Sequence, residues 1–370
     1  MKVLLIHASF GAGHRRAAEA LREAFEHQGI AVEAHDLLEF LLPVVGGFYS
    51  FAYKTMITHS RTLWRLTYEI MDRSKAPYSP ANSVSQRWQF ARLKEFLQNS
   101  DFTHVLSTHY TPSALLADWK SSGVTRATIF SVVTDYEAHR CWKRKELDHY
   151  FVATDFVAGQ LRDTGVPAGK ISVTGIPISA SFSTCIERRA ARNRWNFEEQ
   201  HTVILALCSA LTLKKSIELL EEIRSVAGDL RFLVGAGSDP IKEERLKRHF
   251  RNEKRFMIFG FSSAISEMMS AADLVITKPG GLIISESLAM GLPQILLDPI
   301  PGQEEANARY SSEQKAAVCV SHAPGIYRKT LAVLLADPDR LLQMRTAALR
   351  AGRPRAAEEI VAAVKRATTR

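Results

Sequence analysis

Residues 273–293 read DLVITKPGGLIISESLAMGLP. The apolar, β-branched run Leu274–Ile276 predicts a buried strand, and the Gly280-Gly281 turn after it opens an apolar segment long enough for a helix. A Gly-Leu-Pro turn ends that segment, and a second apolar run, Gln294–Leu297, follows at once. A strand, a helix and a strand in this order predict a βαβ unit, and therefore a parallel sheet.

The same alternation continues along most of the chain. Short β-branched runs are separated by longer amphipathic stretches, which is typical of doubly wound α/β domains. The expected strands lie near residues 3–8, 31–36, 104–107, 127–133, 149–152 and 171–173, and then near 203–207, 231–234, 256–258, 274–276, 294–297 and 317–320. The predicted fold class is α/β.

The length of 370 residues favours two domains, because single hydrophobic cores rarely grow beyond roughly 250 residues. Gly175 and Pro177 mark a turn after the sixth expected strand. We place the boundary there, with an N-terminal domain over residues 1–176 and a C-terminal domain over residues 177–370. The last expected helix, near residues 356–366, is compatible with packing on either domain.

The composition describes a folded protein, with 46% hydrophobic and 24% charged residues. A net charge of +9 favours partners that carry negative charge, such as anionic lipid, phosphorylated substrates or nucleic acid. Nucleic acid is disfavoured, because no zinc-finger, RNP-like or helix-turn-helix pattern accompanies the charge. The four cysteines form no CxxC pair, which predicts neither a zinc site nor a disulfide framework and fits the reducing cytoplasm.

The first expected strand runs directly into a glycine loop, VLLIHASFGAGHRRAA at residues 3–18. Gly11 and Gly13 allow the backbone to approach a ligand, and the start of the following helix attracts negative charge. Arg16 stands where the last glycine of a dinucleotide-binding GxGxxG would be, so NAD is disfavoured. His14, where the loop meets the helix, is a candidate general base. The alternative is a helix residue hydrogen-bonded to a nearby loop.

The glycine turn of the opening stretch predicts a second ligand contact. Main-chain N–H groups of Gly280, Gly281 and Leu282 are expected to form a pyrophosphate nest, to which the helix dipole adds attraction. Glu286, about one turn further along the helix, is placed to reach the hydroxyls of a ribose. The alternative is a plain turn followed by a solvated glutamate.

A third polar segment, PGQEEAN at residues 301–307, follows the end of an expected strand. Open α/β sheets bind their ligands at such strand ends. The side chains of Gln303, Glu304 and Asn307 are suited to sugar hydroxyls.

Four segments together resemble one family, the monogalactosyldiacylglycerol synthases and processive diacylglycerol glucosyltransferases. They are GAGHRRAA at residues 11–18, SVVTDYEAHRCW at 131–142, TKPGGLIISESLAMGLP at 277–293 and PGQEEAN at 301–307. That family is related to the transferase that adds GlcNAc to the lipid-linked precursor of peptidoglycan, and the similarity extends over nearly the whole chain. It implies a GT-B fold of two Rossmann-like domains facing a cleft, an acceptor domain followed by a UDP-sugar domain, no metal or other cofactor, and inversion at the anomeric carbon.

The resemblance also implies roles for single residues. His14 becomes the base, and Asp135 joins it as the second expected catalytic residue. The donor-binding residues implied are Gly11, Gly13, Ser209, Phe261 at the uracil loop, Gly280, Gly281, Leu282, Glu286, Gln303, Glu304 and Asn307. The resemblance places Asp135, His139 and Trp142 near the acceptor, and Arg140 is expected there as part of a basic run. One segment departs from the family: Cys208-Ser209-Ala210-Leu211 stands where the family has a glycine-rich turn, so Ser209 offers a hydroxyl to phosphate without the close approach that glycine allows.

Residues 37–78 mix apolar and aromatic side chains with Lys and Arg, which suits the headgroup region of an anionic bilayer. The expected docking residues are Phe48, Tyr49, Tyr53 and Trp64, and the basic run HRCWKRK at residues 139–145 is a second candidate for lipid phosphate. The alternative is a helical pair with ordinary surface charges. The apolar part of this segment is shorter than the ~20 residues a spanning helix needs, so we expect a peripheral protein on the cytoplasmic side of the cell membrane.

The predicted function is an inverting transfer of galactose or glucose from a UDP-sugar to diacylglycerol, with one sugar or several sugars added in succession. Two alternatives keep the fold: a UDP-sugar epimerase, and a transferase to another lipid-linked acceptor. A third alternative is a catalytically silent UDP-sugar sensor.

Overall fold

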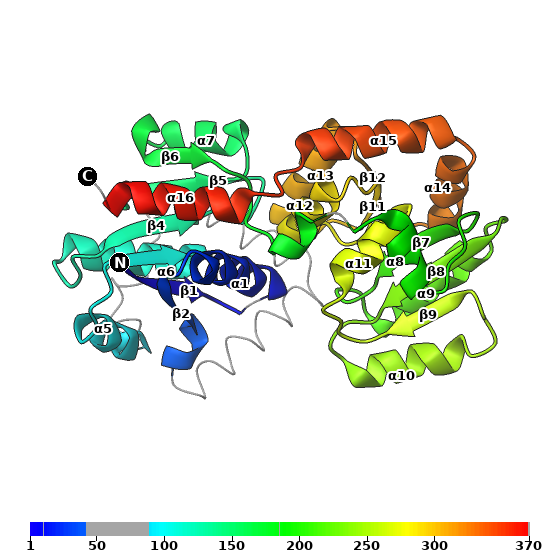
Figure 1. The fold of residues 1–370 in the computed structure, drawn as a ribbon, viewed down its shortest axis with the longest axis horizontal. Helices are drawn as coiled ribbons and strands as arrows, with labels where there is room; N and C mark the ends of the chain where they lie inside the picture. The colour runs from blue at the N-terminus through cyan, green and yellow to red at the C-terminus, as the bar shows by residue number, and fades with distance from the viewer. Residues whose placement is uncertain (10, 42–88, 185, 369–370) are drawn as a thin grey trace. The chain divides into compact units, whose positions relative to one another are not determined.

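The computed structural model describes residues 1–9, 11–41, 89–184 and 186–368, drawn as ribbons in Figure 1. The chain forms two compact units. The first unit contains Met1–Ala180, Ile300–Ala306 and Arg353–Arg370, and the second contains Ser181–Pro299 and Asn307–Gly352. The first unit thus includes three segments beyond the expected boundary at residue 176, namely residues 177–180, 300–306 and 353–370.

The first unit is built on a six-stranded, wholly parallel sheet in the order β2-β1-β3-β4-β5-β6. Its strands are β1 (Lys2–His7), β2 (Ala31–Asp36), β3 (His104–Ser107), β4 (Thr128–Val132), β5 (His149–Val152) and β6 (Ile171–Val173). Its helices are α1 (Ala12–His27), α5 (Ala91–Gln98), α6 (Tyr110–Ser121), α7 (Asp155–Arg162) and α16 (Ala356–Thr368). Short 3-10 turns occur at η1 (Leu37–Phe40), η2 (Arg140–Trp142), η3 (Ala168–Lys170) and η4 (Ala180–Phe182).

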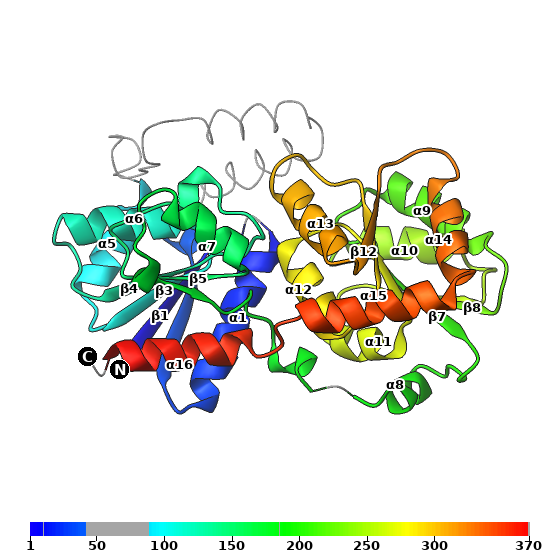
Figure 2. The same ribbon diagram turned by 90° about the horizontal axis from the view of Figure 1, so that it is seen from above.

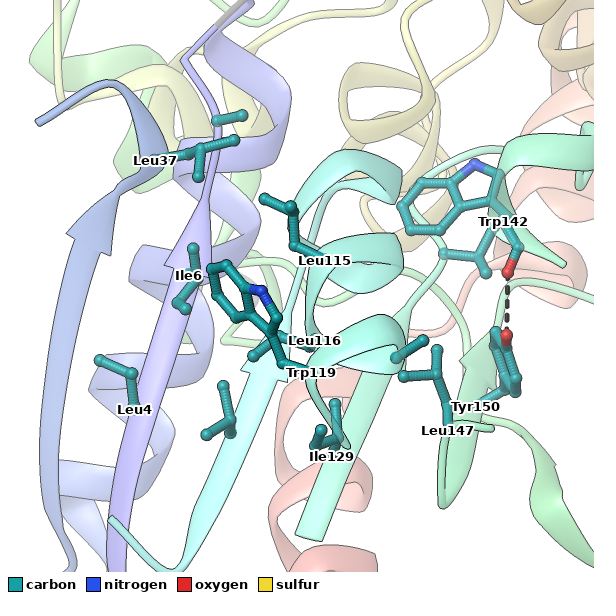
Figure 3. Packing of buried hydrophobic residues seen from close by; sticks show 14 of the residues in the cluster. Leu4, Ile6, Leu37, Leu115, Leu116, Trp119, Ile129, Trp142, Leu147 and Tyr150 are labelled. Carbon is teal, nitrogen blue, oxygen red and sulfur yellow. Dashed lines mark hydrogen bonds between the residues drawn. The ribbon is translucent and has the colours of Figure 1, made fainter. Parts of the chain in front are cut away.

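Both faces of this sheet are covered, because alternate residues of a strand point to opposite faces. Leu4 and Ile6 of β1 pack with the apolar residues of α6, including Trp119, as Figure 3 shows from close by. Val3 and Leu5 pack into a separate cluster on the other face, which is covered by α1 and α16. The near-continuous apolar runs of the sequence follow from burial on both faces.

The C-terminal helix α16 belongs to the first unit because of its apolar stripe. Ile360, Val361 and Val364 are buried among Val3 and Leu5 of β1 and their neighbours. The helix lies beside α1 in both views of the ribbon (Figures 1 and 2). α16 and β1, which lie far apart in the sequence, therefore share one hydrophobic cluster.

The second unit repeats this architecture with a parallel sheet in the order β12-β11-β10-β7-β8-β9. Its strands are β7 (Thr202–Leu207), β8 (Leu230–Gly235), β9 (Phe256–Phe259), β10 (Leu274–Thr277), β11 (Gln294–Leu297) and β12 (Ala317–Val320). Its helices are α8 (Arg188–Arg194), α9 (Leu213–Arg224), α10 (Pro240–His249), α11 (Ile265–Ala271), α12 (Gly281–Ala289), α13 (Gln303–Glu313, whose first residues lie in the first unit), α14 (Ile326–Leu335) and α15 (Pro338–Ala351).

Each sheet has one topological switch point, where the chain leaves a central strand toward opposite edges of the sheet. In the first unit β1 lies between β2 and β3, and in the second unit β7 lies between β8 and β10. Doubly wound sheets bind ligands at the carboxyl ends of the strands beside such a point. The loops after β1 and β3, and those after β7 and β10, are therefore the places to look for a site.

Candidate active site

His14 lies at the switch point of the first sheet, in the first turn of α1. Gly11, which has no side chain, occupies the N-cap of that helix. Nδ1 of His14 is 2.8 Å from the main-chain oxygen of Thr108, which follows β3, and 2.9 Å from Oγ1 of Thr134, which follows β4. Three successive strand ends thus hold one imidazole ring.

These contacts assign the proton on the ring. A carbonyl oxygen can only accept a hydrogen bond, so Nδ1 of His14 carries the hydrogen that it donates to Thr108. The neutral ring then has its lone pair on Nε2. Oγ1 of Thr134 is also 3.4 Å from the same carbonyl, and Oγ1 of Thr108 donates to the main-chain oxygen of His14 at 2.9 Å. The network fixes the ring with Nε2 as the atom able to take a proton.

The surroundings keep this ring neutral. The pKa of His14 is lowered from 6.5 to about 4, chiefly by burial and to a smaller extent by the nearby His7, although the hydrogen bond to Thr108 acts in the opposite direction. His109, whose ring centroid is 4.6 Å from that of His14, has its own pKa lowered well below 6.5, chiefly by burial. At neutral pH the ring is therefore a base that is already unprotonated.

Asp135 follows Thr134 at the end of β4 and is almost fully buried. Its Oδ2 accepts a hydrogen bond from Nε2 of Gln303, a residue of the same unit, at 2.9 Å. Glu304, the next residue, accepts a hydrogen bond from the main-chain N–H of Ile300 at 2.8 Å, which holds the turn before α13. Asp135, the second expected catalytic residue, is therefore hydrogen-bonded to Gln303, one of the residues expected to bind the sugar.

The residues expected near the acceptor divide into three groups. Trp142 is 0% exposed and belongs to the core of the first unit, and the hydroxyl of Tyr150 donates to its main-chain oxygen at 2.9 Å (Figure 3). Its expected place at the acceptor is wrong, because an indole in this position fills the sheet's hydrophobic core. His139 caps the η2 turn through Nδ1, which accepts from the N–H of Cys141, and Arg140 is half-buried. Phe48, Tyr49, Tyr53 and Trp64 lie outside the described residues.

The predicted glycine turn between a strand and a helix is found after β10, and the order of the sheet places it beside the switch point of the second unit. α12 begins at Gly281 with Gly280 as its N-cap. The N–H of Gly280 donates to the main-chain oxygen of Lys278 at 2.9 Å, so it is engaged within the turn and the expected three-amide nest is corrected to two. The N–H groups of Gly281 and Leu282 donate to no group among the described residues.

The remaining residues expected to bind the donor lie on α12 and α13 and in the loops after β7 and β9. Glu286 is only 1% exposed, so the alternative of a solvated helix residue is wrong. Asn307 donates to the main-chain oxygen of Pro279 at 3.2 Å and thereby ties α13 to the turn before α12. Ser209 is exposed at the end of β7, and Phe261 after β9 is 74% exposed.

Some residues at these sites were missed by the sequence reasoning. Thr108 and Thr134 orient His14, and the buried ammonium of Lys278 donates to the main-chain oxygen of Asp298. Lys278 and Thr134 lie inside the stretches that carry the family resemblance, which was the available signal. Within the described residues no three His, Cys, Asp or Glu side chains are grouped to hold a metal ion. No helix of that part of the chain combines the length and apolar character needed to cross a membrane.

Comparison with known proteins assigns the family. A model of monogalactosyldiacylglycerol (MGDG) synthase matches residues 14–178, and a model of the glycosyltransferase family 28 C-terminal domain matches residues 205–360. The processive diacylglycerol beta-glucosyltransferase of Bacillus cereus (strain AH187) is 34% identical over 367 residues, which cover 97% of this chain and 92% of the relative. That of Bacillus cytotoxicus is 32% identical over 366 residues with the same coverage.

This chain belongs to the diacylglycerol glycosyltransferase family. The recognition made from its motifs is confirmed, and so is the class of enzyme, a glycosyltransferase. Solved structures agree on the fold: MurG of Acinetobacter baumannii has a TM-score of 0.64 at 14% identity, covering 99% of both chains. The S. aureus MnaA-UDP complex has a TM-score of 0.68 at 14% identity, covering 100% of this chain and 97% of that one. The expected GT-B fold of two Rossmann-like domains is confirmed.

The fold alone does not distinguish transferases from epimerases. The UDP-GlcNAc 2-epimerase from Neisseria meningitidis has a TM-score of 0.63 at 14% identity, covering 99% of this chain and 100% of that one. Sequence identity of 34% over nearly the whole chain links this diacylglycerol glycosyltransferase to its relatives far more specifically than a shared backbone does.

Proposed function

We propose that this protein transfers glucose from UDP-glucose to the free hydroxyl of diacylglycerol, with inversion at the anomeric carbon. Its family membership and the names of its relatives favour diacylglycerol as the acceptor and glucose as the sugar. The observation that carries the chemistry is the hydrogen bond from Nδ1 of His14 to Thr108, which leaves Nε2 as a proton acceptor at the switch point.

The reaction then needs one proton transfer. The diacylglycerol oxygen attacks the anomeric carbon, the bond from that carbon to the diphosphate oxygen breaks, and UDP leaves with the electron pair. Nε2 of His14 takes the hydroxyl proton. Because the ring is neutral before the reaction, no proton has to be removed from it first.

The second unit supports the departure of UDP. The free N–H groups of Gly281 and Leu282, at the positive end of the α12 dipole, suit a diphosphate. Donors of this kind stabilise charge that develops in the transition state. We therefore propose a reaction without a metal ion, in which main-chain amides and the helix dipole do what a divalent cation does in other transferases.

The membrane arrangement is part of the proposal. A net charge of +9 suits an anionic surface, on the cytoplasmic side where UDP-sugars are available. Each Lys or Arg near such a surface contributes about 1 kcal/mol. The acceptor, an apolar lipid with one hydroxyl, requires the enzyme to work at that surface.

The test is a transfer assay with the full chain. Dioleoylglycerol is presented in vesicles of phosphatidylcholine, with or without phosphatidylglycerol, together with radiolabelled UDP-glucose or UDP-galactose, in the presence and absence of EDTA. We expect a labelled glycolipid with UDP-glucose, faster on the anionic vesicles and unchanged by EDTA. Absence of a lipid product with both donors would overturn the proposal, and a changed UDP-sugar without any glycolipid would establish the epimerase instead.

A further inference from the structure

Lys242 is a buried lysine beneath the loop that joins β7 to α9 in the second unit. It lies in the first turn of α10 and is 6% exposed. Its Nζ donates to the main-chain oxygens of Cys208 and of Leu211, the latter at 2.7 Å. Among the described residues no carboxylate comes within ion-pair distance of this ammonium, although Asp239 caps the same helix.

Burying this ammonium costs free energy, because it loses its hydration. A hydrogen bond to a neutral carbonyl offsets less of that cost than an ion pair with a carboxylate would. Burial accordingly lowers the pKa of Lys242. A methionine of similar length would fill the same space without that cost. We therefore look for the role of this lysine in the loop to which it is hydrogen-bonded, at the switch point.

The two hydrogen bonds orient two peptide planes. In a trans peptide the C=O and the following N–H point in opposite directions. Because the carbonyls of Cys208 and Leu211 face the ammonium, the N–H groups of Ser209 and Thr212 face away from it. Within the described residues neither N–H donates to another group, and Ser209 is exposed.

The loop is also fixed from the side. Gly237 has φ +91°, and a Cβ on it would lie 2.8 Å from Cβ of Ser209, so the turn after β8 packs directly on the loop. No residue from 208 to 212 has a positive φ, the conformation through which a glycine-rich turn redirects its peptide planes. The loop reaches its geometry with ordinary residues held by a lysine.

We propose that Lys242 is a positioning residue for the donor's diphosphate. By holding two carbonyls it directs the N–H groups of Ser209 and Thr212 toward phosphate oxygens, and it places a positive charge behind them. This role rests on the proposed function, which brings a nucleoside diphosphate to this switch point. It also accounts for the absence of glycines from Cys208-Ser209-Ala210-Leu211.

The experiment compares UDP with uridine, which lacks the diphosphate. Calorimetry on the full chain measures both ligands for wild type, Lys242→Met and Lys242→Arg. The control is Lys247→Met, on the same helix, where Nζ is exposed and pairs with Glu243 at 2.6 Å. We expect Lys242→Met to weaken the binding of UDP at least about tenfold and that of uridine less than twofold. Lys242→Arg should recover most of the lost UDP affinity, and the control variant should bind both ligands as wild type does.

Transfer kinetics give a second measurement. Lys242→Met should raise the KM for UDP-glucose by the same factor while the KM for diacylglycerol stays unchanged. If Lys242→Met does not fold, Lys242→Gln, which retains N–H donors without the charge, takes its place and should still weaken UDP relative to uridine at least about threefold.

Equal effects on UDP and uridine, or no effect on either, would overturn the role of Lys242 while leaving the transferase intact. Wild-type protein that binds no UDP would overturn the proposed function, and this inference with it.

Discussion

Nδ1 of His14 lies 2.8 Å from the main-chain oxygen of Thr108, 94 residues further along the chain. The contact exists because β3 pairs with β1 on the side opposite β2, which brings the start of α1 beside the end of β3. The group that orients the ring is a neutral carbonyl. It fixes the tautomer, but it does not hold a proton on the ring as a carboxylate would.

Replacing His14 tests its role directly. His14→Ala should lower kcat by about 100-fold to 10,000-fold, the range expected for loss of a general base. UDP binding should be unchanged, since the proposed diphosphate donors lie in the second unit. Transfer rates and calorimetry measure the two quantities, and His27→Ala, at the exposed end of the same helix, is the control. Equal kcat in the two variants would exclude His14 as the base.

Thr134 should affect catalysis indirectly, by orienting the imidazole ring of His14. Thr134→Val keeps the shape but removes the hydroxyl 2.9 Å from Nδ1, a hydrogen bond worth about 1 kcal/mol, so kcat should fall by about fivefold to tenfold. KM values should change little. Thr134→Ser, which retains the hydroxyl, should stay close to wild type. A serine variant as slow as the valine variant would mean that packing of the methyl group, and not the hydrogen bond, is what the ring requires.

The pH dependence should reflect the lowered pKa of His14. The folded value of about 4 lies below the ordinary 6.5, so the neutral ring predominates through the range where a free histidine titrates. kcat/KM should therefore stay level from pH 8 to about 6 and fall only on approach to pH 4. The same shift means that the unfolded chain binds a proton which the folded chain does not, so stability due to this group is complete above pH 6.5 and is lost as the pH falls toward 4.

Initial rates in a buffer of constant ionic strength give this profile. Recovery of the rate after return to pH 7.5 separates titration from unfolding. An acid limb centred near 6.5 would show that the ring is hydrated or ion-paired in the working enzyme, contrary to the described geometry.

The strands were predictable because a strand buried on both faces appears in the sequence as a short, near-continuous apolar run. Each of the twelve expected runs coincides with an observed strand to within one residue at either end. The glycine loops were predictable for a related reason, since a strand, a tight turn and a helix start at fixed spacing leave few other conformations. What the pattern did not contain was the order of strands in the sheet.

The missing order explains why Thr108 was not predicted. Its carbonyl becomes a partner of His14 only through the pairing of β3 with β1. The prediction for Trp142 was wrong for a different reason. An aromatic residue among Arg and Lys is typical of a membrane interface, yet here the indole is buried together with Arg144, and only Arg140, Lys143 and Lys145 of the run are partly or fully exposed. Local composition does not distinguish an aromatic residue at a membrane interface from one in the hydrophobic core.

A carboxylate on one helix caps another in the second unit, and this contact predicts a loss of stability without a loss of chemistry. Glu222 of α9 accepts from the N–H groups of Gly325 and Tyr327, each at 2.9 Å, and from that of Arg328 at 3.3 Å. These groups form the N-terminus of α14, where negative charge is favourable. Glu222→Gln turns an amide NH₂ toward N–H donors and removes the charge, so unfolding should become easier by about 1–3 kcal/mol.

Calorimetric unfolding should show the second unit melting several degrees lower, at roughly 2–4 °C per kcal/mol for a unit of this size. Glu218→Gln, one turn earlier on α9, removes only a 3.9 Å surface pair with Lys214 and should shift the melting temperature by less than about 1 °C. His14 and its partners lie in the other unit, so kcat at 25 °C should be unchanged in both variants. Equal melting temperatures for the two variants would mean that the α14 N-terminus gains nothing from the carboxylate, and that water serves it equally well.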